Sequence, residues 1–307
     1  MFKNIVFMGT PNFAVPVLKS LYQYGYPVNV VYSQPPKKSF RGQKINKSAV
    51  HKMTENLSLN LRIPDNLKNN KKEYNFLKSL NPDLVIVVAY GHIIPKEYLE
   101  LSKNGFINIH ASLLPKWRGA APIQRSIMNL DQTTGISIMK ITEKLDAGPI
   151  MFQEKINIEK NMNAEDLSSK ISELSSKLIL DCIEKIEEGQ ANFIEQDESN
   201  VTYAKKINKE ESKIDWNQDA NNILSKINGL YPNPGACFSF MSERYKILKA
   251  SLSDLEGEAG TVLDNNLTVA CKNKSIQINE IQRQGKNRQN AREFLLGSKI
   301  KKGRILN

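Results

Sequence analysis

Three polar side chains in this sequence have the chemical types that acyl transfer requires. Asn108 and His110 lie two residues apart in the apolar run 106–111, and Asp146 follows in the stretch 145–149, Leu-Asp-Ala-Gly-Pro. Alternate residues of a β-strand point to the same face, so Asn108 and His110 are expected side by side. An amide can donate to an oxyanion, an imidazole can move a proton, and a carboxylate can hold the imidazole. The three residues together therefore predict a site for acyl transfer.

A plainer interpretation of Asn108 and His110 stays open. Polar residues within a strand can be structural groups whose hydrogen bonds are satisfied inside the protein. The chemical interpretation is favoured because both lie near the carboxyl end of their strand, where open α/β sheets place their sites. The next residues, Ser112 to Pro115, form a short loop whose backbone can face a ligand, and a helix is expected to start within 117–123.

The motifs of several other site types are missing. The stretch 9–13, Gly-Thr-Pro-Asn-Phe, has one glycine where the dinucleotide fingerprint has three, and no GxxxxGK phosphate loop occurs. The three cysteines are far apart, and the three histidines form no HExxH or Cys/His cluster, so we expect no metal and free thiols. The longest apolar run, 84–90, is far shorter than the roughly 20 residues of a membrane span. We see no secretory signal and expect a cytoplasmic protein.

The elements that would position these residues alternate between strands and helices. Buried strands are expected at 4–9, 27–33, 82–90, 106–111 and 135–141. The run 82–90 is apolar on both faces, which suits a parallel strand covered by helices on both sides. A helix is expected after Pro11, and a long amphipathic helix capped by Asn163 runs to Gly189. This order predicts an α/β domain with a doubly wound, mostly parallel sheet.

The pattern changes near residue 205. A short helix is expected at 220–227. Short strand candidates separated by turn signals follow at 237–240, 245–250, 260–263, 267–271 and 275–281. Several short strands of this kind predict a small β-barrel. We therefore expect a catalytic domain over 1–189, a linker over 190–206 and a C-terminal domain over 207–307.

The formal net charge of +11 favours a polyanionic partner. Residues 34–54, here called the basic loop, hold six cations and no acid: Lys37, Lys38, Arg41, Lys44, Lys47 and Lys52. Residues 283–304, here called the basic tail, hold eight cations and one acid. Such stretches can bind an RNA backbone, or they can be a solvated lysine-rich surface.

Several motifs resemble one known family. The run 108–125, NIHASLLPKWRGAAPIQR, is similar to the signature of the tetrahydrofolate-dependent formyltransferases. The stretches 7–14, 88–91, 145–148, 201–206 and 214–216 are similar to the same family in the same order. The resemblance spans almost the whole chain and is strongest to the members that formylate methionyl-tRNA. The basic loop departs from the family pattern at Pro36 and Phe40.

The resemblance implies a doubly wound formyltransferase domain followed by an OB-like β-barrel domain. It implies 10-formyltetrahydrofolate as donor, the α-amine of initiator methionyl-tRNA as acceptor, a role in translation initiation, and no metal. By matching positions, the catalytic residues would be Asn108, His110 and Asp146. The folate site would be lined by Ser112, Leu113, Leu114 and Pro115. The tRNA would be bound by Arg41, with Lys37, Lys38 and Lys44 as point charges. We expect a monomer that binds no membrane.

Two other functions stay open. A folate formyltransferase that acts on a small amine, such as a nucleotide-sugar or a purine precursor, would share the three catalytic residues. It would not need the basic loop or the basic tail. A non-enzymatic RNA-binding protein would need both basic stretches but could lose the three residues, which are present here.

Overall fold

A computed structural model describes residues 2–39 and 44–307, which form two compact units. The first unit comprises Met1–Gly119, Gly135–Ile156 and Ser168–Tyr203. The second unit comprises Ala120–Thr134, Asn157–Leu167 and Ala204–Asn307. Each unit thus combines several stretches of the chain, and the domain boundaries expected at 189 and 207 stay a prediction. Within the described residues, no helix combines the length and apolar character needed to cross a membrane.

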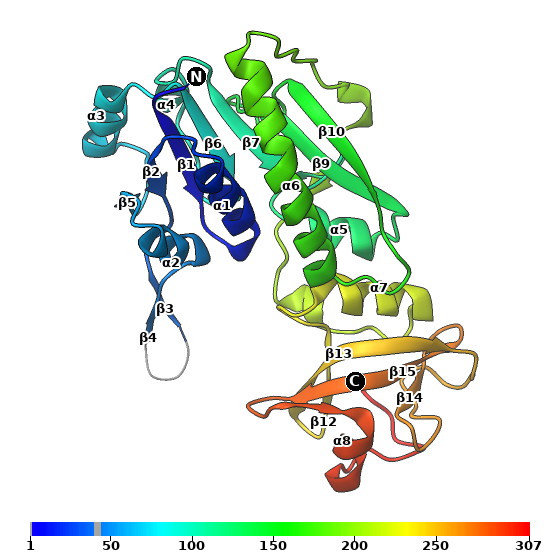
Figure 1. Cartoon of the computed structure of the whole chain (residues 1–307). Coiled ribbons are helices and arrows are strands. Elements are labelled where there is room, and N and C mark those ends of the chain that lie inside the picture. The colour runs from blue at the N-terminus through cyan, green and yellow to red at the C-terminus, as the bar shows by residue number, and fades with distance from the viewer. Residues whose placement is uncertain (1, 40–43) are drawn as a thin grey trace. The chain divides into compact units, whose positions relative to one another are not determined.

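The first unit is built on a seven-stranded sheet (Figure 1). Its spatial order is β10 (Ile150–Asn157), β9 (Thr133–Lys140), β7 (Phe106–His110), β6 (Leu84–Val88), β1 (Ile5–Gly9), β2 (Val28–Tyr32) and β5 (Leu61–Arg62). The pairs from β7 to β5 are parallel, whereas β9 runs antiparallel to β7. The chain passes outward from β1 to β5 and then crosses back to β6. The predicted doubly wound, mostly parallel sheet is confirmed.

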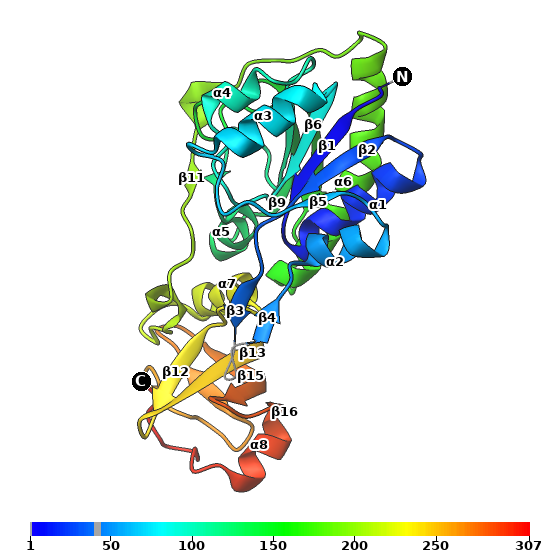
Figure 2. The same ribbon diagram turned by 90° about the vertical axis from the view of Figure 1, so that its left-hand side faces the viewer.

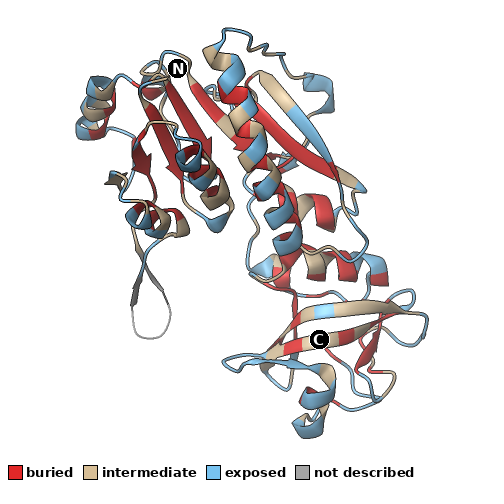
Figure 3. Ribbon diagram, viewed as in Figure 1, coloured by how far each residue is buried: buried red, intermediate tan, exposed pale blue. Residues whose placement is uncertain are grey.

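Helices cover both faces of this sheet. Val6, Met8 and Val87 point to one face, where they share a core with residues of α3 (Lys71–Leu80) and α4 (Lys96–Leu99). On the other face, α1 (Val15–Gln23) and α6 (Ala164–Glu187) lie side by side (Figures 1 and 2), and Ser20 Oγ donates to Ser176 O. Strands β1 and β6 are buried along their whole length, as Figure 3 shows. The apolar character of both faces of 82–90 is thereby explained.

Two helix starts illustrate how local sequence sets these elements. Asn163 Oδ1 accepts from the backbone N–H groups of Glu165 and Asp166, so the predicted cap of α6 is confirmed. The first helix does not begin directly after Pro11. A 3₁₀ turn, η1 (Asn12–Ala14), comes first, and α1 then starts so that Pro16 falls in its first turn, where a missing N–H costs no hydrogen bond.

Shorter elements connect the sheet. The basic loop contains a hairpin of β3 (Lys37–Ser39) and β4 (Lys44–Asn46), followed by α2 (Ala49–Asn56). A second two-stranded pair joins β8 (Arg118–Gly119) to β11 (Tyr203–Ala204), and η2 (Glu198–Asn200) precedes β11.

The second unit contains a five-stranded antiparallel sheet. Its strands are β12 (Cys237–Phe240), β13 (Glu243–Ser253), β15 (Ser275–Arg283) and β14 (Thr268–Ala270), with β16 (Arg288–Asn290) also paired to β15. Its helices are α5 (Pro122–Met128), η3 (Glu210–Ser212), α7 (Ala220–Leu230) and α8 (Ala291–Gly297). Register shifts between Ile247 and Ala250 bend β13, because a bulge inserts an extra residue into one strand.

This curled sheet confirms the predicted small β-domain, with one difference. The strand expected at 260–263 forms only isolated bridges, Thr261 to Ile305 and Val262 to Val269. The aromatic residues Trp216, Phe238 and Tyr245 lie in the core that the sheet encloses.

Candidate active site

Strand β7 places two of the predicted catalytic residues. Asn108 lies opposite Val87 of β6 and Met139 of β9, and His110 lies opposite Ser137 of β9. Asn108 is half-buried, and the His110 side chain is only 6% exposed. Because they alternate with Ile109 along the strand, Asn108 and His110 share a face at the carboxyl end of β7.

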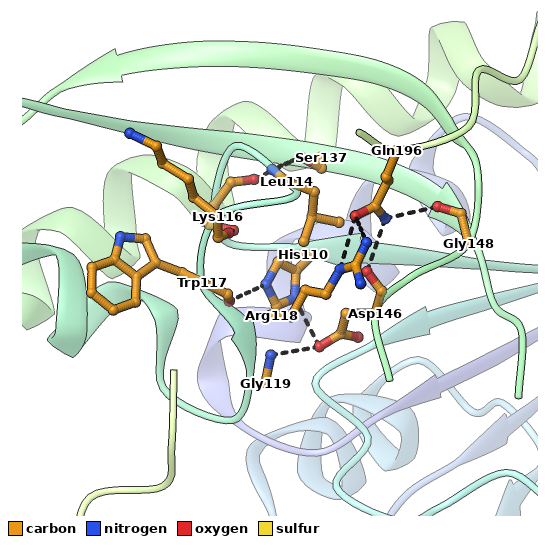
Figure 4. A network of polar contacts seen from close by, with 11 residues as sticks. His110, Leu114, Lys116, Trp117, Arg118, Gly119, Ser137, Asp146, Gly148 and Gln196 are labelled. Atoms are coloured by element: carbon orange, nitrogen blue, oxygen red, sulfur yellow. Dashed lines mark hydrogen bonds and ion pairs between the residues drawn. The ribbon is translucent and has the colours of Figure 1, made fainter. Parts of the chain in front are cut away.

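The structure brings Asp146 to His110 from the turn after β9 (Figure 4). Asp146 Oδ2 lies 3.7 Å from His110 Nδ1 and accepts a hydrogen bond of 2.8 Å from the backbone N–H of Gly119. A separation of 3.7 Å is an ion-pair distance and is too long for a hydrogen bond. A small movement of either side chain toward the other would therefore form a direct hydrogen bond.

The other nitrogen of His110 is held by the backbone. Nε2 lies 2.9 Å from the carbonyl oxygen of Trp117. A carbonyl can only accept, so Nε2 carries a proton and Nδ1 is the nitrogen that gains or loses one. When it is protonated, Nδ1 faces the Asp146 carboxylate and the imidazole can act as a donor.

Two residues that hold this pair have unusual backbone conformations. Trp117 has φ +62° and Asp146 has φ +46°, in the left-handed region that non-glycine residues seldom occupy. Such strained residues cluster at functional sites, where the surrounding contacts over-determine them. The two strained residues lie on the segments that contact the two sides of the His110 ring.

The loop predicted to line a folate site is tightly held from behind. Ser112 is buried, and its hydroxyl donates to Lys116 O at 2.6 Å, so its side chain is engaged inside the loop. Ser137 Oγ of β9 donates to Ser112 O at 2.7 Å and accepts from Leu114 N at 3.0 Å. Gln153 Nε2 of β10 donates to Leu114 O at 2.8 Å and to Ser137 Oγ at 2.9 Å.

Close packing also sets the position of this loop. A Cβ placed on Gly135 would lie 2.5 Å from Leu113 Cδ2 and 2.2 Å from Glu154 O. Only glycine therefore lets Leu113 approach β9 and β10 this closely. Leu113 and Pro115 are half-buried, whereas Leu114 is buried.

Arg118, Gln196 and Glu198 join the site although no pattern predicted them. Gln196 Nε2 donates to Asp146 O and to Gly148 O, each at 2.8 Å, and its Oε1 accepts from the Arg118 guanidinium (Figure 4). Glu198 Oε1 lies 2.7 Å from Arg118 Nη2, and this carboxylate raises the pKa of Arg118 above its ordinary value. Arg118 stands inside the family-like run, but Gln196 and Glu198 lie in a stretch that was expected to be a plain linker.

The structure describes only some of the predicted tRNA contacts. Arg41 falls outside the described residues, and Lys37, Lys38 and Lys44 belong to the hairpin strands β3 and β4. In the second unit, all eight cations of the basic tail are exposed: Arg283, Lys286, Arg288, Arg292, Lys299, Lys301, Lys302 and Arg304. Arg283 is also paired with Glu243.

Two further features concern metal and ligand binding. Among the residues that the structure describes, no group of three His, Cys, Asp or Glu side chains is placed to hold a metal ion. A cavity of 560 Å³ lies in the second unit, lined by Phe240, Tyr245, Phe294 and neighbouring residues. It contains none of the three predicted catalytic residues.

Comparisons with known proteins show the family to which this chain belongs. The family model described as formyl transferase matches residues 3–183, and the one described as formyl transferase, C-terminal domain, matches residues 206–299. The methionyl-tRNA formyltransferase of Pelagibacter ubique is 61% identical over 309 residues, which cover 100% of both chains. That of Chelativorans sp. is 41% identical over 305 residues, which cover 98% of both chains.

Solved structures share the fold. HypX from Aquifex aeolicus in complex with tetrahydrofolic acid is 18% identical, with a TM-score of 0.66, over 98% of this chain and 49% of that one. The N-formyltransferase from Helicobacter canadensis in complex with folinic acid and dTDP-3-aminofucose is 20% identical, with a TM-score of 0.68, over 92% of this chain and 100% of that one. At these identities the likeness concerns the fold alone.

Proposed function

We propose that this chain, which belongs to the formyl transferase family, transfers the formyl group of 10-formyltetrahydrofolate to the α-amine of initiator methionyl-tRNA for translation initiation. One observation carries the proposal. His110 and Asp146 lie 3.7 Å apart at the carboxyl end of the sheet, beside Asn108. The full-length likeness to methionyl-tRNA formyltransferases supports the choice of acceptor.

In the proposed reaction, the α-amine of the methionyl group forms a bond to the formyl carbon. The tetrahedral intermediate carries an oxyanion, which Asn108 stabilises by donating a hydrogen bond and protonated His110 stabilises by its positive charge; one such donor is worth about 3 kcal/mol. The bond between that carbon and N10 of the folate then breaks. Asp146 stabilises the protonated imidazole, and the pair passes the proton lost by the amine to N10. The products are formylmethionyl-tRNA and tetrahydrofolate, so atoms and charge balance.

The donor side of the site suits a folate. The backbone from Ser112 to Pro115 is fixed by Ser137 and Gln153, so this loop can offer the pteridine ring a rigid surface. Ile93 and Leu145, which follow β6 and β9, are 87% and 62% exposed. Apolar side chains of this kind can cover a flat ring in a largely preformed pocket. These residues would hold the co-substrate that supplies the formyl group.

The acceptor side calls for a polyanion. The exposed cations of the basic tail and the net charge of +11 suit the phosphate backbone of a tRNA. Arg41 is proposed to contact the acceptor stem, because its planar fork can pair with two acceptors at once. We also propose that the protein is a monomer and that it acts in the cytoplasm, where charged initiator tRNA is available.

A small-amine formyltransferase is the second candidate. The Helicobacter canadensis enzyme, solved with dTDP-3-aminofucose, has a similar fold. However, a small amine would not require the basic loop or the basic tail. The 61% identity over the full chain also favours the tRNA acceptor.

A transfer assay tests the proposal directly. Purified protein is given 10-formyltetrahydrofolate and one of three acceptors: initiator methionyl-tRNA, elongator methionyl-tRNA or an amino sugar nucleotide. We expect rapid formylation of the initiator tRNA, slow formylation of the elongator tRNA and none of the sugar. Transfer to the sugar but to neither tRNA would establish the second candidate.

A further inference from the structure

Gln196 connects the catalytic aspartate to a buried arginine. Its Nε2 donates to the carbonyl oxygens of Asp146 and Gly148, and its Oε1 accepts from Arg118 Nε at 3.0 Å and Nη2 at 2.7 Å (Figure 4). We infer that Gln196, held by Arg118, which Glu198 contacts in turn, is a positioning residue that keeps the Asp146 carboxylate against His110. This inference rests on the proposed function, because it assigns a role within that reaction.

The chemistry of the amide allows only one orientation. A side-chain amide has two N–H donors and one carbonyl acceptor, and all of them are used here. The flipped amide would set its oxygen against two carbonyl oxygens and its N–H groups against a guanidinium. Gln196 therefore has no equivalent alternative orientation, and it fixes the turn and the arginine to each other.

The turn needs such an anchor. Asp146 is held at φ +46°, a conformation that costs free energy in a non-glycine residue. A Cβ on Gly148 would lie only 1.9 Å from Lys140 O, so the turn is also packed closely on the end of β9. Gln196 binds the carbonyl groups on both sides of Ala147. Without those bonds the strained residue is free to relax, and its carboxylate then leaves His110.

Arg118 makes the anchor rigid. Its side chain is only 3% exposed, and the Glu198 carboxylate contacts it at 2.7 Å and 3.3 Å. The backbone on either side of it touches the catalytic pair, since Trp117 O binds His110 Nε2 and Gly119 N binds Asp146 Oδ2. The same three consecutive residues thus orient both catalytic side chains, and Gln196 ties them to the turn.

The segment that carries Gln196 is itself held by backbone hydrogen bonds at both ends. Ile194 exchanges two backbone hydrogen bonds with Ile150 at the start of β10, and Thr202 O accepts from Arg118 N at 2.9 Å. Gln196 and Glu198 lie between these two attachment points. The stretch that was expected to be a linker is therefore part of the scaffold of the site.

A mutational cycle tests the inference. Gln196→Met keeps the length of the side chain and removes its hydrogen bonds. We expect kcat to fall about 10- to 100-fold while KM for both substrates changes little, since a misplacement of about 1 Å can cost that much. In the Asp146→Ala background, Gln196→Met should lower kcat by less than about 3-fold, because the residue it positions is gone. Glu195→Ala, an exposed neighbour, serves as the control and should match wild type.

The outcomes separate the inference from its alternatives. Wild-type kcat in Gln196→Met, or an equal fall in both backgrounds, would overturn the positioning role. If Gln196→Met does not fold, Glu198→Ala tests the same series of contacts from its exposed end. We expect that variant to lose kcat roughly 3- to 10-fold at unchanged KM. Wild-type kcat in Glu198→Ala would overturn the inference. A wild-type protein that formylates no tRNA would instead overturn the proposed function and the inference with it.

Discussion

The His110 ring is held on one side by a backbone carbonyl and faces a carboxylate on the other. In the proposed reaction the charge of Asp146 acts on the ring across 3.7 Å, without a direct hydrogen bond. We predict that Asn108→Ala, His110→Ala and Asp146→Ala each lower turnover at least about 100-fold. Folding and tRNA affinity should stay near wild type, as measured by thermal unfolding and by filter binding. Near-normal turnover of the His110 variant would refute the proposed roles.

Ser137 offers a second test on a single side chain. Its hydroxyl makes three hydrogen bonds that hold the loop 112–115, and removing it leaves Leu114 N and Ser112 O without that partner. Ser137→Ala should lower the free energy of unfolding by roughly 1–3 kcal/mol and raise KM for 10-formyltetrahydrofolate. Urea titration and initial-rate kinetics measure the two effects.

Ser175 supplies a matched control for that experiment. It is also fully buried, but within the described part of the chain its Oγ has no hydrogen-bond partner. Ser175→Ala should therefore leave stability unchanged or raise it slightly, because it removes an unsatisfied polar group. Equal effects of the two substitutions would mean that the bonds of Ser137 do not stabilise the loop.

Strand β5 and helix α3 are joined by a partly buried ion pair. Arg62 Nε lies 2.6 Å from Glu73 Oε2, and Tyr32 Oη donates to the same carboxylate at 3.2 Å. Burial alone would raise the pKa of Glu73, but the hydrogen bonds and charge of Arg62 outweigh it. The pKa of Glu73 therefore lies below its ordinary 4.5.

The sign of the pH dependence follows from that shift. A carboxyl whose pKa is lowered in the folded state stabilises the fold at pH values above its unfolded-state pKa. This contribution is lost as the pH falls from about 4.5. In Arg62→Met the burial remains and the cation is lost, so the pKa of Glu73 should rise and stability should fall as the pH increases through that region. Urea unfolding from about pH 3 to pH 7 measures both profiles.

Lys96→Met, which breaks an exposed pair with Glu143, should keep the wild-type profile. Superimposable profiles of wild type and Arg62→Met would contradict the account.

The basic loop is the element proposed to contact the tRNA. Its six cations repel one another, although Lys47 pairs with Glu55 at 2.6 Å, and an RNA backbone would supply further anions. Arg41→Ala should lower formylation of initiator tRNA roughly 10- to 100-fold, as expected when a hydrogen bond to a charged group is removed. It should leave folate binding intact. Lys52→Ala, an exposed cation of α2, is the control for simple loss of charge.

Limited proteolysis gives an independent measurement of the basic loop. Cleavage after Lys37, Lys38 or Arg41 should be fast in the free protein and suppressed by initiator tRNA. An absence of protection, together with normal formylation by Arg41→Ala, would favour the small-amine acceptor.

Elements and contacts differ in how far the sequence predicts them. Continuous apolar runs such as 84–88 and a local cap such as Asn163 carry their signal within a few residues, and both were predicted correctly. The prediction of a strand at 260–263 was wrong. Its partners, Ile305 and Val269, each pair with this stretch at a single bridge. Gln196 contacts Asp146, which is 50 residues away in the sequence, and Arg118, which is 78 residues away. No periodic pattern in the sequence predicts either contact. Side-chain networks of this kind depend on the completed fold, whereas Asn108, His110 and Asp146 were predicted to be catalytic from stretches that resemble one family.

At the scale of the whole molecule, charge is the property that would recruit the substrate. The chain carries 43 Lys+Arg against 32 Asp+Glu, and eight cations of the basic tail are exposed on the second unit. Each cation that contacts a phosphate releases most of one counterion, which makes affinity fall as salt rises. We predict that the triple variant Lys286→Gln, Arg288→Gln, Arg292→Gln weakens binding of initiator and elongator tRNA alike.

The salt dependence distinguishes direct phosphate binding from the effect of net charge. Because the triple variant can no longer bind three of the phosphates, the slope of log affinity against log salt should flatten by about 2 to 3 units. The triple variant Lys19→Gln, Lys155→Gln, Lys177→Gln removes the same charge from exposed positions of the first unit and should leave the slope nearly unchanged. If both variants flatten the slope equally, the chain attracts tRNA through its overall charge. If neither does, the basic tail is a solvated surface and the tRNA is bound elsewhere.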